Sequence, residues 1–340
     1  MEKGIELLMA PCDNFARYSG TASIPVCGTH VPHKVTIAIP TYRRVDTLRA
    51  TVESALCQRG FDDYDILICD NNPERGDETE EYVCSLRSPR IVYYKHSANL
   101  GMTGNWNRIT ELCKSEYLAL VHDDDLLHPE FLSRCMGIVS SKPGIDCLYP
   151  LKKRFSGDAA DYPELAPQPV FRLRMRDYLP GNPDAPTGVL IRKDAIASLG
   201  GWKEEAYPSA DYYFNVLAAE KLRVYRYDQP LCMYRWSINE SQKLGTLLAF
   251  MRTCQPLKEW TGTRLHLPRR WKTAFARHFN EYLRAMIKER YPAEYPEVDF
   301  SGLELPRDGR EAARDSRITR TLGRLISATH FFERRLCRRY

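Results

Sequence analysis

Short apolar segments alternate with helical segments over residues 35–139, and this alternation constrains the fold more than any other feature. Four segments, at 35–40, 65–69, 91–95 and 117–121, have the length and composition of buried β-strands. Apolar residues spaced three and four apart predict helices over 45–56, 106–113 and 131–139. Because short buried strands separated by helices form βαβ units, the sequence predicts an α/β fold with a mostly parallel central sheet flanked by helices.

The pattern changes after residue 150. Residues 152–186 contain six prolines and predict an extended, partly irregular insertion over the sheet. A strand is expected at 188–192, a helix at 210–220, and short strands at 222–227 and 231–236. Helical spacing begins at residue 247, with a proline-rich break at 291–306. The first 33 residues have no clear period. The sequence therefore predicts an irregular arm over 1–33, a main domain over 34–240 and a helical extension over 241–340.

Polar residues gather where three of the predicted strands end. In parallel sheets, ligands bind beyond the carboxyl ends of the strands, so these positions are the expected site of chemistry. The three clusters are Thr41-Tyr42-Arg43-Arg44, Asp70-Asn71-Asn72 and His122-Asp123-Asp124-Asp125.

The acidic run at residues 123–125 carries the strongest functional signal. Three adjacent carboxylates repel one another, so the folded chain needs a counter-charge beside them. Mg²⁺ or Mn²⁺ would supply it, because these cations bind carboxylates together with phosphate oxygens. The alternative is the start of a helix near Pro129, where acidic residues are favourable. Asp125 alone would serve that purpose, so the whole run favours a site for a metal ion and a diphosphate.

Three further candidates are open to two interpretations each. Asp70-Asn71-Asn72 would suit recognition of a nucleobase and a ribose, or a turn before Pro73. Thr41, Tyr42 and Arg43 offer a stacking ring and a phosphate-binding cation, but neither is specific alone. Asp211 stands where a helix is expected to begin, so it is either a cap or a general base.

The positive charge is confined to one end of the chain. The formal net charge is +5, and residues 307–340 contain ten arginines against four acidic residues. Apolar residues recur at helical spacing in the same segment. The segment therefore predicts an amphipathic helix that either packs on the main domain or contacts an anionic membrane surface. Since the rest of the chain has no excess of positive charge, we expect no nucleic-acid partner.

The eleven cysteines do not indicate a zinc cluster, because no CxxC pair occurs. Five of them fall within apolar stretches, namely Cys57, Cys69, Cys113, Cys135 and Cys147. Buried reduced thiols are the simplest explanation and predict a cytoplasmic location. The first ten residues do not have the pattern of a signal peptide, and no apolar run approaches the ~20 residues of a spanning helix.

Six sequence blocks together resemble the family 2 glycosyltransferases, which have the GT-A fold. The resemblance covers roughly residues 34–237, and the blocks occur in the order and spacing of that family. They are VTIAIPTYRR (35–44), ILICDNN (66–72), NLGMTGNWNRI (99–109), LVHDDDLLHPEFL (120–132), TGVLIRKDAI (187–196) and SADYYF (209–214).

The resemblance implies a role for each block. Thr41 and Tyr42 would hold the nucleotide base, Arg43 would stand beside them, and Asp70 would hydrogen-bond the base. Asn99, Gly101 and Asn105 would line the donor, in a nucleotide-sugar half over 34–125. Asp211 would be the general base of an inverting transfer, in an acceptor half over 126–240.

The resemblance also implies a DXD-type pair, Asp123 and Asp124, at the ribose, metal and diphosphate. Many members have an aspartate where this chain has His122, so Asp124 is the first candidate for the metal ligand and Asp125 the second. The histidine itself is expected to contact the donor or the loop. Ala210 also stands where the family often has an acidic residue before its base.

The resemblance predicts a metal-dependent hexosyltransferase that uses a nucleotide-diphosphate sugar, with UDP as the expected nucleotide. The acceptor would be a saccharide or a lipid-linked sugar of surface polysaccharide or glycolipid assembly, reached at the inner face of the membrane. Two rival functions are a sugar nucleotidyltransferase and a non-catalytic nucleotide-sugar-binding module. The first needs a glycine-rich loop after its first strand, where this chain reads PTYRR. The second is disfavoured by the carboxylates at 70, 123, 124 and 211.

Overall fold

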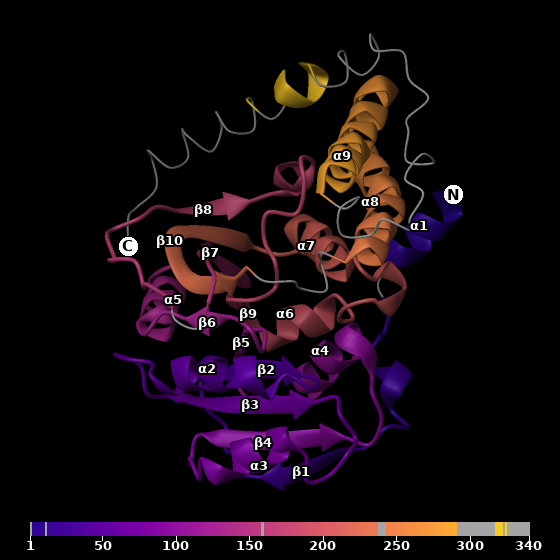
Figure 1. Cartoon of the computed structure of the whole chain (residues 1–340). Coiled ribbons are helices and arrows are strands. Elements are labelled where there is room, and N and C mark those ends of the chain that lie inside the picture. Colours follow the sequence, from indigo (N-terminus) through magenta and orange to yellow (C-terminus); the bar gives the residue numbers. More distant parts are fainter. Residues whose placement is uncertain are drawn as a thin grey trace.

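The computed structural model describes residues 2–10, 12–157, 160–236, 243–290, 317–321 and 324. One ten-stranded sheet runs through it in the order β1-β4-β3-β2-β5-β9-β7-β10-β6, with β8 paired to β10 (Figure 1). Its strands are β1 (Ser23–Cys27), β2 (Val35–Thr41), β3 (Tyr64–Asp70), β4 (Ile91–His96), β5 (Tyr117–Leu120), β6 (Leu126–Leu127), β7 (Cys147–Phe155), β8 (Val170–Leu173), β9 (Val189–Arg192) and β10 (Val224–Arg235).

Helices cover both faces of this sheet. One apolar core contains residues of α2 (Val45–Leu56), α3 (Glu78–Ser85) and α5 (Phe131–Ser141). The core on the opposite face contains residues of α4 (Gly101–Leu112), α6 (Lys193–Ser198), α7 (Ala210–Lys221) and α8 (Leu244–Arg264). This layered arrangement is the predicted α/β architecture, and the close match of the strands near residues 35–121 to their predicted positions confirms the periodicity argument.

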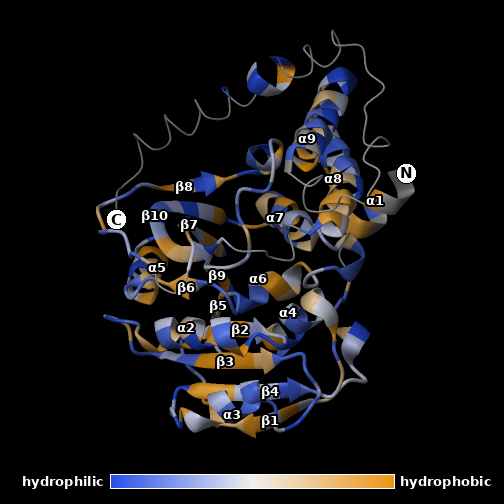
Figure 2. Cartoon of the chain, in the orientation of Figure 1, coloured by the Kyte–Doolittle hydropathy of each residue, from blue (hydrophilic) through white to orange (hydrophobic). Residues whose placement is uncertain are grey.

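Strand β2 shows why the central strands are read so easily from the sequence. All seven of its residues are buried. Ile37 and Ile39 belong to the core on the α2 side, and Ala38 belongs to the core on the α4 side. A strand covered on both faces is apolar at most positions on both sides, which produces a nearly continuous apolar run and not an alternating one. Figure 2 shows the same concentration of hydrophobic residues along neighbouring strands.

The parallel arrangement holds for the strands that carry the site. Strand β2 pairs in parallel with β3 on one side and with β5 on the other, and β3 pairs in parallel with β4. Strand β9 is antiparallel to both of its neighbours, β5 and β7. The carboxyl ends of β2, β3 and β5 therefore meet at one edge of the sheet, where the polar clusters were predicted.

The arm over residues 1–33 is more ordered than we predicted. It contains α1 (Glu2–Met9), a short 3₁₀ helix η1 (Ala16–Tyr18) and strand β1, which pairs antiparallel with β4. Pro25 does not prevent this pairing, because proline is excluded only from central strands. Strand β1 is the first strand in the order and so lies at an edge of the sheet. The side of β1 that faces away from β4 therefore needs no hydrogen-bonding partner.

The second half of the domain differs from the prediction in three details. The two short strands expected at 222–236 are one strand, β10, whose pairing with β7 changes register near Tyr227 and Pro230. The insertion over 152–186 contains the end of β7, strand β8 and a 3₁₀ helix, η2 (Met175–Tyr178). Another 3₁₀ helix, η3 (Glu204–Ala206), precedes α7.

Among the cysteines predicted to be buried, Cys57 is exposed because it ends α2.

Helices occupy the start of the extension, as predicted. Helix α9 (Arg269–Arg290) packs along α8, with a small apolar cluster between the two helices, and α1 contacts α8 (Figure 1). In the described residues, no helix has the length and hydropathy of a membrane span. Most of the basic segment 307–340 lies outside the described residues, so its two predicted alternatives, packing on the main domain and contact with a membrane, stay predictions.

A buried lysine connects α8 to the main domain. Lys258 is 1% exposed, and its Nζ donates to the carbonyl oxygen of Leu179 at 2.6 Å and to the hydroxyl of Tyr212 at 3.1 Å. It also stands over the ring of Phe279, 4.6 Å from the centroid. Burial lowers the pKa of Lys258 to about 7, against an opposing effect of Cys254.

This pKa predicts a pH-dependent contribution to stability. The folded-state pKa of Lys258 is about 7. An unfolded lysine has a pKa of about 10.4, so between these values the unfolded state binds the extra proton. The contribution of Lys258 therefore increases with pH over that window, by up to about 1.4 kcal/mol per pH unit. In urea unfolding, the free energy of unfolding of the parent minus that of Lys258→Met should be higher at pH 9 than at pH 7. The exposed Lys221→Met is the control. A pH-independent difference for Lys258→Met would contradict this account.

Candidate functional site

A cavity of about 850 Å³ opens at the carboxyl ends of β2 and β5. Its wall combines the end of β2, the start of α4, the loop after β5, the segment before α7 and the start of α8. The lining residues are Pro40, Thr41, Tyr42, Arg44, Asn71, Asn99, Gly101, Met102, Thr103, Asn105, Trp106, His122, Asp123, Asp124, Ala185, Pro186, Glu204, Tyr207, Pro208, Asp211, Tyr234, Thr246 and Phe250.

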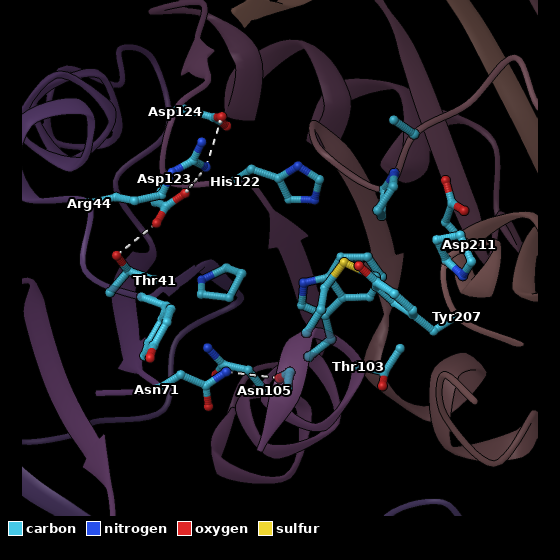
Figure 3. Close-up of a pocket in the computed structure, with 18 of the residues that line it drawn as sticks. Thr41, Arg44, Asn71, Thr103, Asn105, His122, Asp123, Asp124, Tyr207 and Asp211 are labelled. Carbon is cyan, nitrogen blue, oxygen red and sulfur yellow. Dashed lines mark hydrogen bonds and ion pairs between the residues drawn. The ribbon is translucent and has the colours of Figure 1, made fainter. Parts of the chain in front are cut away.

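The acidic loop after β5 is held by residues that follow β2. Thr41 donates its hydroxyl to Asp123 Oδ2 at 2.8 Å. The guanidinium of Arg44 lies 3.2 Å from Asp123 Oδ1 and 3.0 Å from Asp124 Oδ2 (Figure 3). Both aspartates are 6% exposed, so the arginine supplies the nearby positive charge that the sequence argument required.

Burial shifts the pKa values of two side chains in this loop, Asp123 and His122. Burial raises the pKa of Asp123 to about 6, although Arg44 opposes the rise. Burial also lowers the pKa of His122 to about 4, so its imidazole is neutral at pH 7. The imidazole stacks on the indole of Trp106, with ring centroids 5.7 Å apart. A neutral imidazole beside carboxylates is the form that ligates metal ions.

His122, Asp124 and Asp125 form a candidate metal centre. One ligand atom from each lies within 4.8 Å of the others. His122 Nε2 is buried and has no hydrogen-bond partner among the residues that the structure describes. The set therefore fits a divalent cation. Asp124 faces the cavity, whereas Asp125 is fully buried and accepts the backbone N–H of Arg235 at 2.8 Å. The structure thus adds His122, which we had not expected to be a ligand, to the two predicted aspartates.

Asp211 lies on the opposite side of the cavity from Arg44 and Asp123 (Figure 3). It begins the first turn of α7, and its side chain accepts hydrogen bonds from Asn182 Nδ2 at 2.9 Å and from the N–H of Tyr212 at 2.8 Å. Burial raises the pKa of Asp211 to about 6. A carboxylate that titrates just below neutral pH and faces a cavity can accept a proton from a bound hydroxyl.

The start of α4 forms the floor of the cavity. Gly101 has a φ of +70°, which favours glycine, and its N–H donates to Asn99 Oδ1 at 2.8 Å. Asn105 is buried and donates to the carbonyl oxygen of Cys69 at 3.0 Å, so it ties α4 to β3. The three predicted residues of this loop and helix therefore lie together at the cavity.

Two of the residues predicted to bind the donor do not reach the cavity lining. Asp70 is fully buried beneath it, where its carboxylate accepts the Tyr93 hydroxyl at 2.8 Å and lies 3.2 Å from Lys95 Nζ. These internal partners occupy the carboxylate, and a direct contact with a base is not supported by its position. Arg43 has a φ of +52°, and its side chain is directed to Asn72 and Glu74.

Sequence reasoning placed Arg44 in the polar cluster after the first strand but gave it no role, although it is the next residue after Arg43. Both arginines follow β2, and only the backbone turn at Arg43 decides which of them faces the acidic loop. The cavity also contains Tyr207 and Phe250, which carry no motif. Tyr207 is 42% exposed, and Phe250 comes from the helical extension, so only the folded chain brings them to the site.

Residues 36–200 match the family model "Glycosyl transferase family 2". Over 91 residues, the chain is 34% identical to "UDP-Glc:alpha-D-GlcNAc-diphosphoundecaprenol beta-1,3-glucosyltransferase WfaP" of Escherichia coli, a match that spans 27% of this chain and 35% of that protein. Over 205 residues, it is 23% identical to an "Uncharacterized glycosyltransferase" of Haemophilus influenzae, spanning 58% of this chain and 66% of the relative.

A solved structure has a similar fold. The structure of S. aureus TarS 1-349 in complex with UDP-GlcNAc superimposes with a TM-score of 0.56 at 15% identity. The superposition covers 78% of this chain and 76% of that one. At this level of identity, the likeness concerns the fold, and it supports the GT-A architecture that the sequence predicted.

The pairing of Arg44 with two buried aspartates predicts a charge-dependent stability. Arg44→Gln leaves Asp123 and Asp124 without their cation and should lower the free energy of unfolding by about 1–3 kcal/mol in metal-free protein. Added Mn²⁺ should recover part of this loss, because a divalent cation supplies the missing charge. Urea unfolding in EDTA and in Mn²⁺ would measure both effects.

The adjacent Arg43→Gln is the matched control for this experiment. Its side chain is 59% exposed and lies outside the cavity, so its effect should stay within about 0.5 kcal/mol. Equal losses for the two variants would contradict the assignment of Arg44 as the counter-charge.

Proposed function

Because the chain belongs to the glycosyl transferase family 2 through residues 36–200, we propose that it transfers a sugar from a nucleotide-diphosphate donor to an acceptor hydroxyl with inversion. One observation carries the proposal: an acidic, metal-competent loop and a separate carboxylate, Asp211, line opposite sides of one cavity (Figure 3). An inverting transfer needs a site for the leaving diphosphate and a base on the other side of the sugar.

We assign the donor to the side of the cavity that contains Thr41, Tyr42 and Asp123. The exposed ring of Tyr42 is available to stack on a base, and Asp123, which lines the same cavity, would accept a ribose hydroxyl. The start of α4, with Asn99 and Gly101, is favourable for the negative charge of a diphosphate. UDP is the proposed nucleotide, since a relative is named for UDP-Glc and a neighbouring structure contains UDP-GlcNAc.

His122, Asp124 and Asp125 would hold Mn²⁺ or Mg²⁺. When bound, such a cation offsets the charge that develops on the leaving nucleoside diphosphate. Arg44 already contacts Asp124 and lies at the cavity, so it would add a second positive charge to the diphosphate side.

Asp211 would act as the general base. The acceptor oxygen attacks the anomeric carbon from the face opposite the diphosphate, and the bond from that carbon to the diphosphate oxygen breaks with its electron pair. The proton of the acceptor hydroxyl passes to the Asp211 carboxylate. Its pKa of about 6 keeps it largely ionised at pH 7 and still basic enough to accept that proton.

The acceptor would enter beside Tyr207 and Phe250, next to the base. An exposed aromatic ring at the cavity is suited to stacking on a sugar ring. A saccharide or a lipid-linked sugar of surface polysaccharide assembly is the proposed acceptor, supported by the diphosphoundecaprenol-linked substrate in the name of the E. coli relative. This acceptor would be met in the cytoplasm at the membrane surface, where the basic segment 307–340 is predicted to bind.

The donor can be identified by a screen of nucleotide sugars for thermal stabilisation, with Mn²⁺ present. A UDP-sugar should give the largest shift, and transfer or slow hydrolysis of that sugar should require the metal. Asp124→Asn should abolish the metal-dependent turnover and keep the fold, whereas the exposed Asp46→Asn should have no effect. Near-normal turnover of Asp124→Asn in EDTA would contradict the metal role, and binding without any turnover would favour a non-catalytic module.

The base assignment makes a separate prediction. Asp211→Asn should lower kcat by about 10²–10⁴-fold, the usual contribution of a positioned general base, with little change in donor affinity. In the parent enzyme, kcat should fall as the pH drops below about 6, because Asp211 then becomes protonated. A variant that lost donor affinity and kept kcat would show instead that Asp211 is a donor contact.

A further inference from the structure

Two asparagines stand behind Asp211 in a chain of hydrogen bonds. Asn182 donates Nδ2–H to Asp211 Oδ2 at 2.9 Å, and Asn215 donates Nδ2–H to Asn182 Oδ1 at 2.9 Å. Asn215 also donates to the carbonyl oxygen of Asp184 at 2.6 Å and accepts the hydroxyl of Tyr149 at 2.6 Å. Asn182 belongs to the insertion, and Asn215 lies one turn after Asp211 on α7.

The donor-to-acceptor direction of these hydrogen bonds is fixed at Asn215. A backbone carbonyl only accepts hydrogen bonds, so the contact with Asp184 requires the Nδ2 end of Asn215 to point that way. The same amide group then meets the Oδ1 of Asn182, and the opposite, donating end of Asn182 faces Asp211. Asn215 is 2% exposed and cannot exchange these partners for water.

The hydrogen bonds donated to Asp211 favour its ionised form. Oδ2 faces the Asn182 N–H and Oδ1 faces the Tyr212 N–H, so a proton on the bonded side of either oxygen would meet a donor. Asp211 also contributes to the cavity lining, where a bound hydroxyl would meet it. Neither asparagine lines the cavity, so both act only through Asp211.

Other influences on Asp211 raise its pKa in some cases and lower it in others. Burial is the largest influence and raises the pKa of Asp211, whereas the N–H of Tyr212, the amide of Asn182 and the charge of Lys152 on β7 lower it. Tyr149 on β7 and Cys254 on α8 also face this carboxylate, and burial keeps both neutral at pH 7. Asn182 is therefore one of few contacts that oppose the effect of burial.

We propose that Asn182 and Asn215 are positioning residues that hold Asp211 ionised and directed at the acceptor. This inference rests on the proposed function, in which Asp211 is the general base. The arrangement resembles the fixing of a catalytic side chain by a hydrogen-bonded partner behind it, with an amide pair in place of a carboxylate.

The test is a direct titration of Asp211 in the full chain without any donor. Protein labelled with ¹³C at the aspartate carboxyl carbons is titrated by NMR, and the Asp211 signal is assigned by its loss in Asp211→Asn. The parent should titrate near pH 6. Asn182→Leu, which keeps the size of the side chain, and Asn182→Ala should each move the midpoint upward by about one pH unit, because a hydrogen bond to the charged form is lost. Asn215→Ala should move it the same way by less.

A buried asparagine elsewhere separates this effect from a loss of stability. Asn107 is 2% exposed and makes two hydrogen bonds to the backbone of Trp202, so Asn107→Ala should destabilise the protein and leave the Asp211 midpoint unchanged. An unchanged midpoint in folded Asn182→Leu or Asn182→Ala would overturn the proposal. If Asp211→Asn kept full turnover, the base role would fail, yet the titration would still decide whether the asparagines control this carboxylate.

Discussion

The shared ion pairs of Arg44 with Asp123 and Asp124 are the interaction on which the site depends. Three consecutive carboxylates repel one another in a buried loop unless each has a partner. Asp123 is held by Thr41 and Arg44, Asp124 by Arg44, and Asp125 by the backbone N–H of Arg235. The partners come from two different parts of the sheet, so the loop is fixed from the β2 side and from the β10 side together.

This arrangement follows from the topology of the sheet. Strands β2 and β5 are parallel neighbours, so the residues that follow each of them leave the sheet at the same edge. Strand β10 reaches the same loop through its antiparallel pairing with β6, which immediately follows the acidic run. The metal-competent end of the cavity therefore needs no insertion or extension, whereas the end that contains Asp211 is built from them, through Asn182, Thr246 and Phe250.

The contrast explains how much of the molecule the sequence predicted. The strands and helices over 35–139 could be predicted because strands buried on both faces form nearly continuous apolar runs and because apolar residues in helices recur every three or four positions. The location of the acidic run at the cavity followed from the rule for strand ends, whereas Asp211 was singled out by its place at a predicted helix start and by the family resemblance. The donor contacts of Asp70 and Arg43 stay predictions. Their positions outside the cavity lining depend on local turns and on partners such as Lys95, which no periodic pattern reveals. Asn182 precedes Asp211 by 29 positions, in a segment without a recognisable period, so its contact could not be anticipated.

The same contrast separates two kinds of chemistry within one cavity. The acidic loop lies close to a permanent cation, so its charge state depends on burial, which raises the pKa of Asp123, and on Arg44, which lowers it. Asp211 has no ion-pair partner among the described residues. Burial raises its pKa, whereas neutral donors and the charge of Lys152 lower it. A base paired tightly with an arginine would be a poor proton acceptor, because an opposite charge lowers its pKa by one to three units, on the order of a hundredfold in basicity. In the proposed mechanism, neutral amides such as Asn182 orient the carboxylate at a smaller cost in basicity than a cation would.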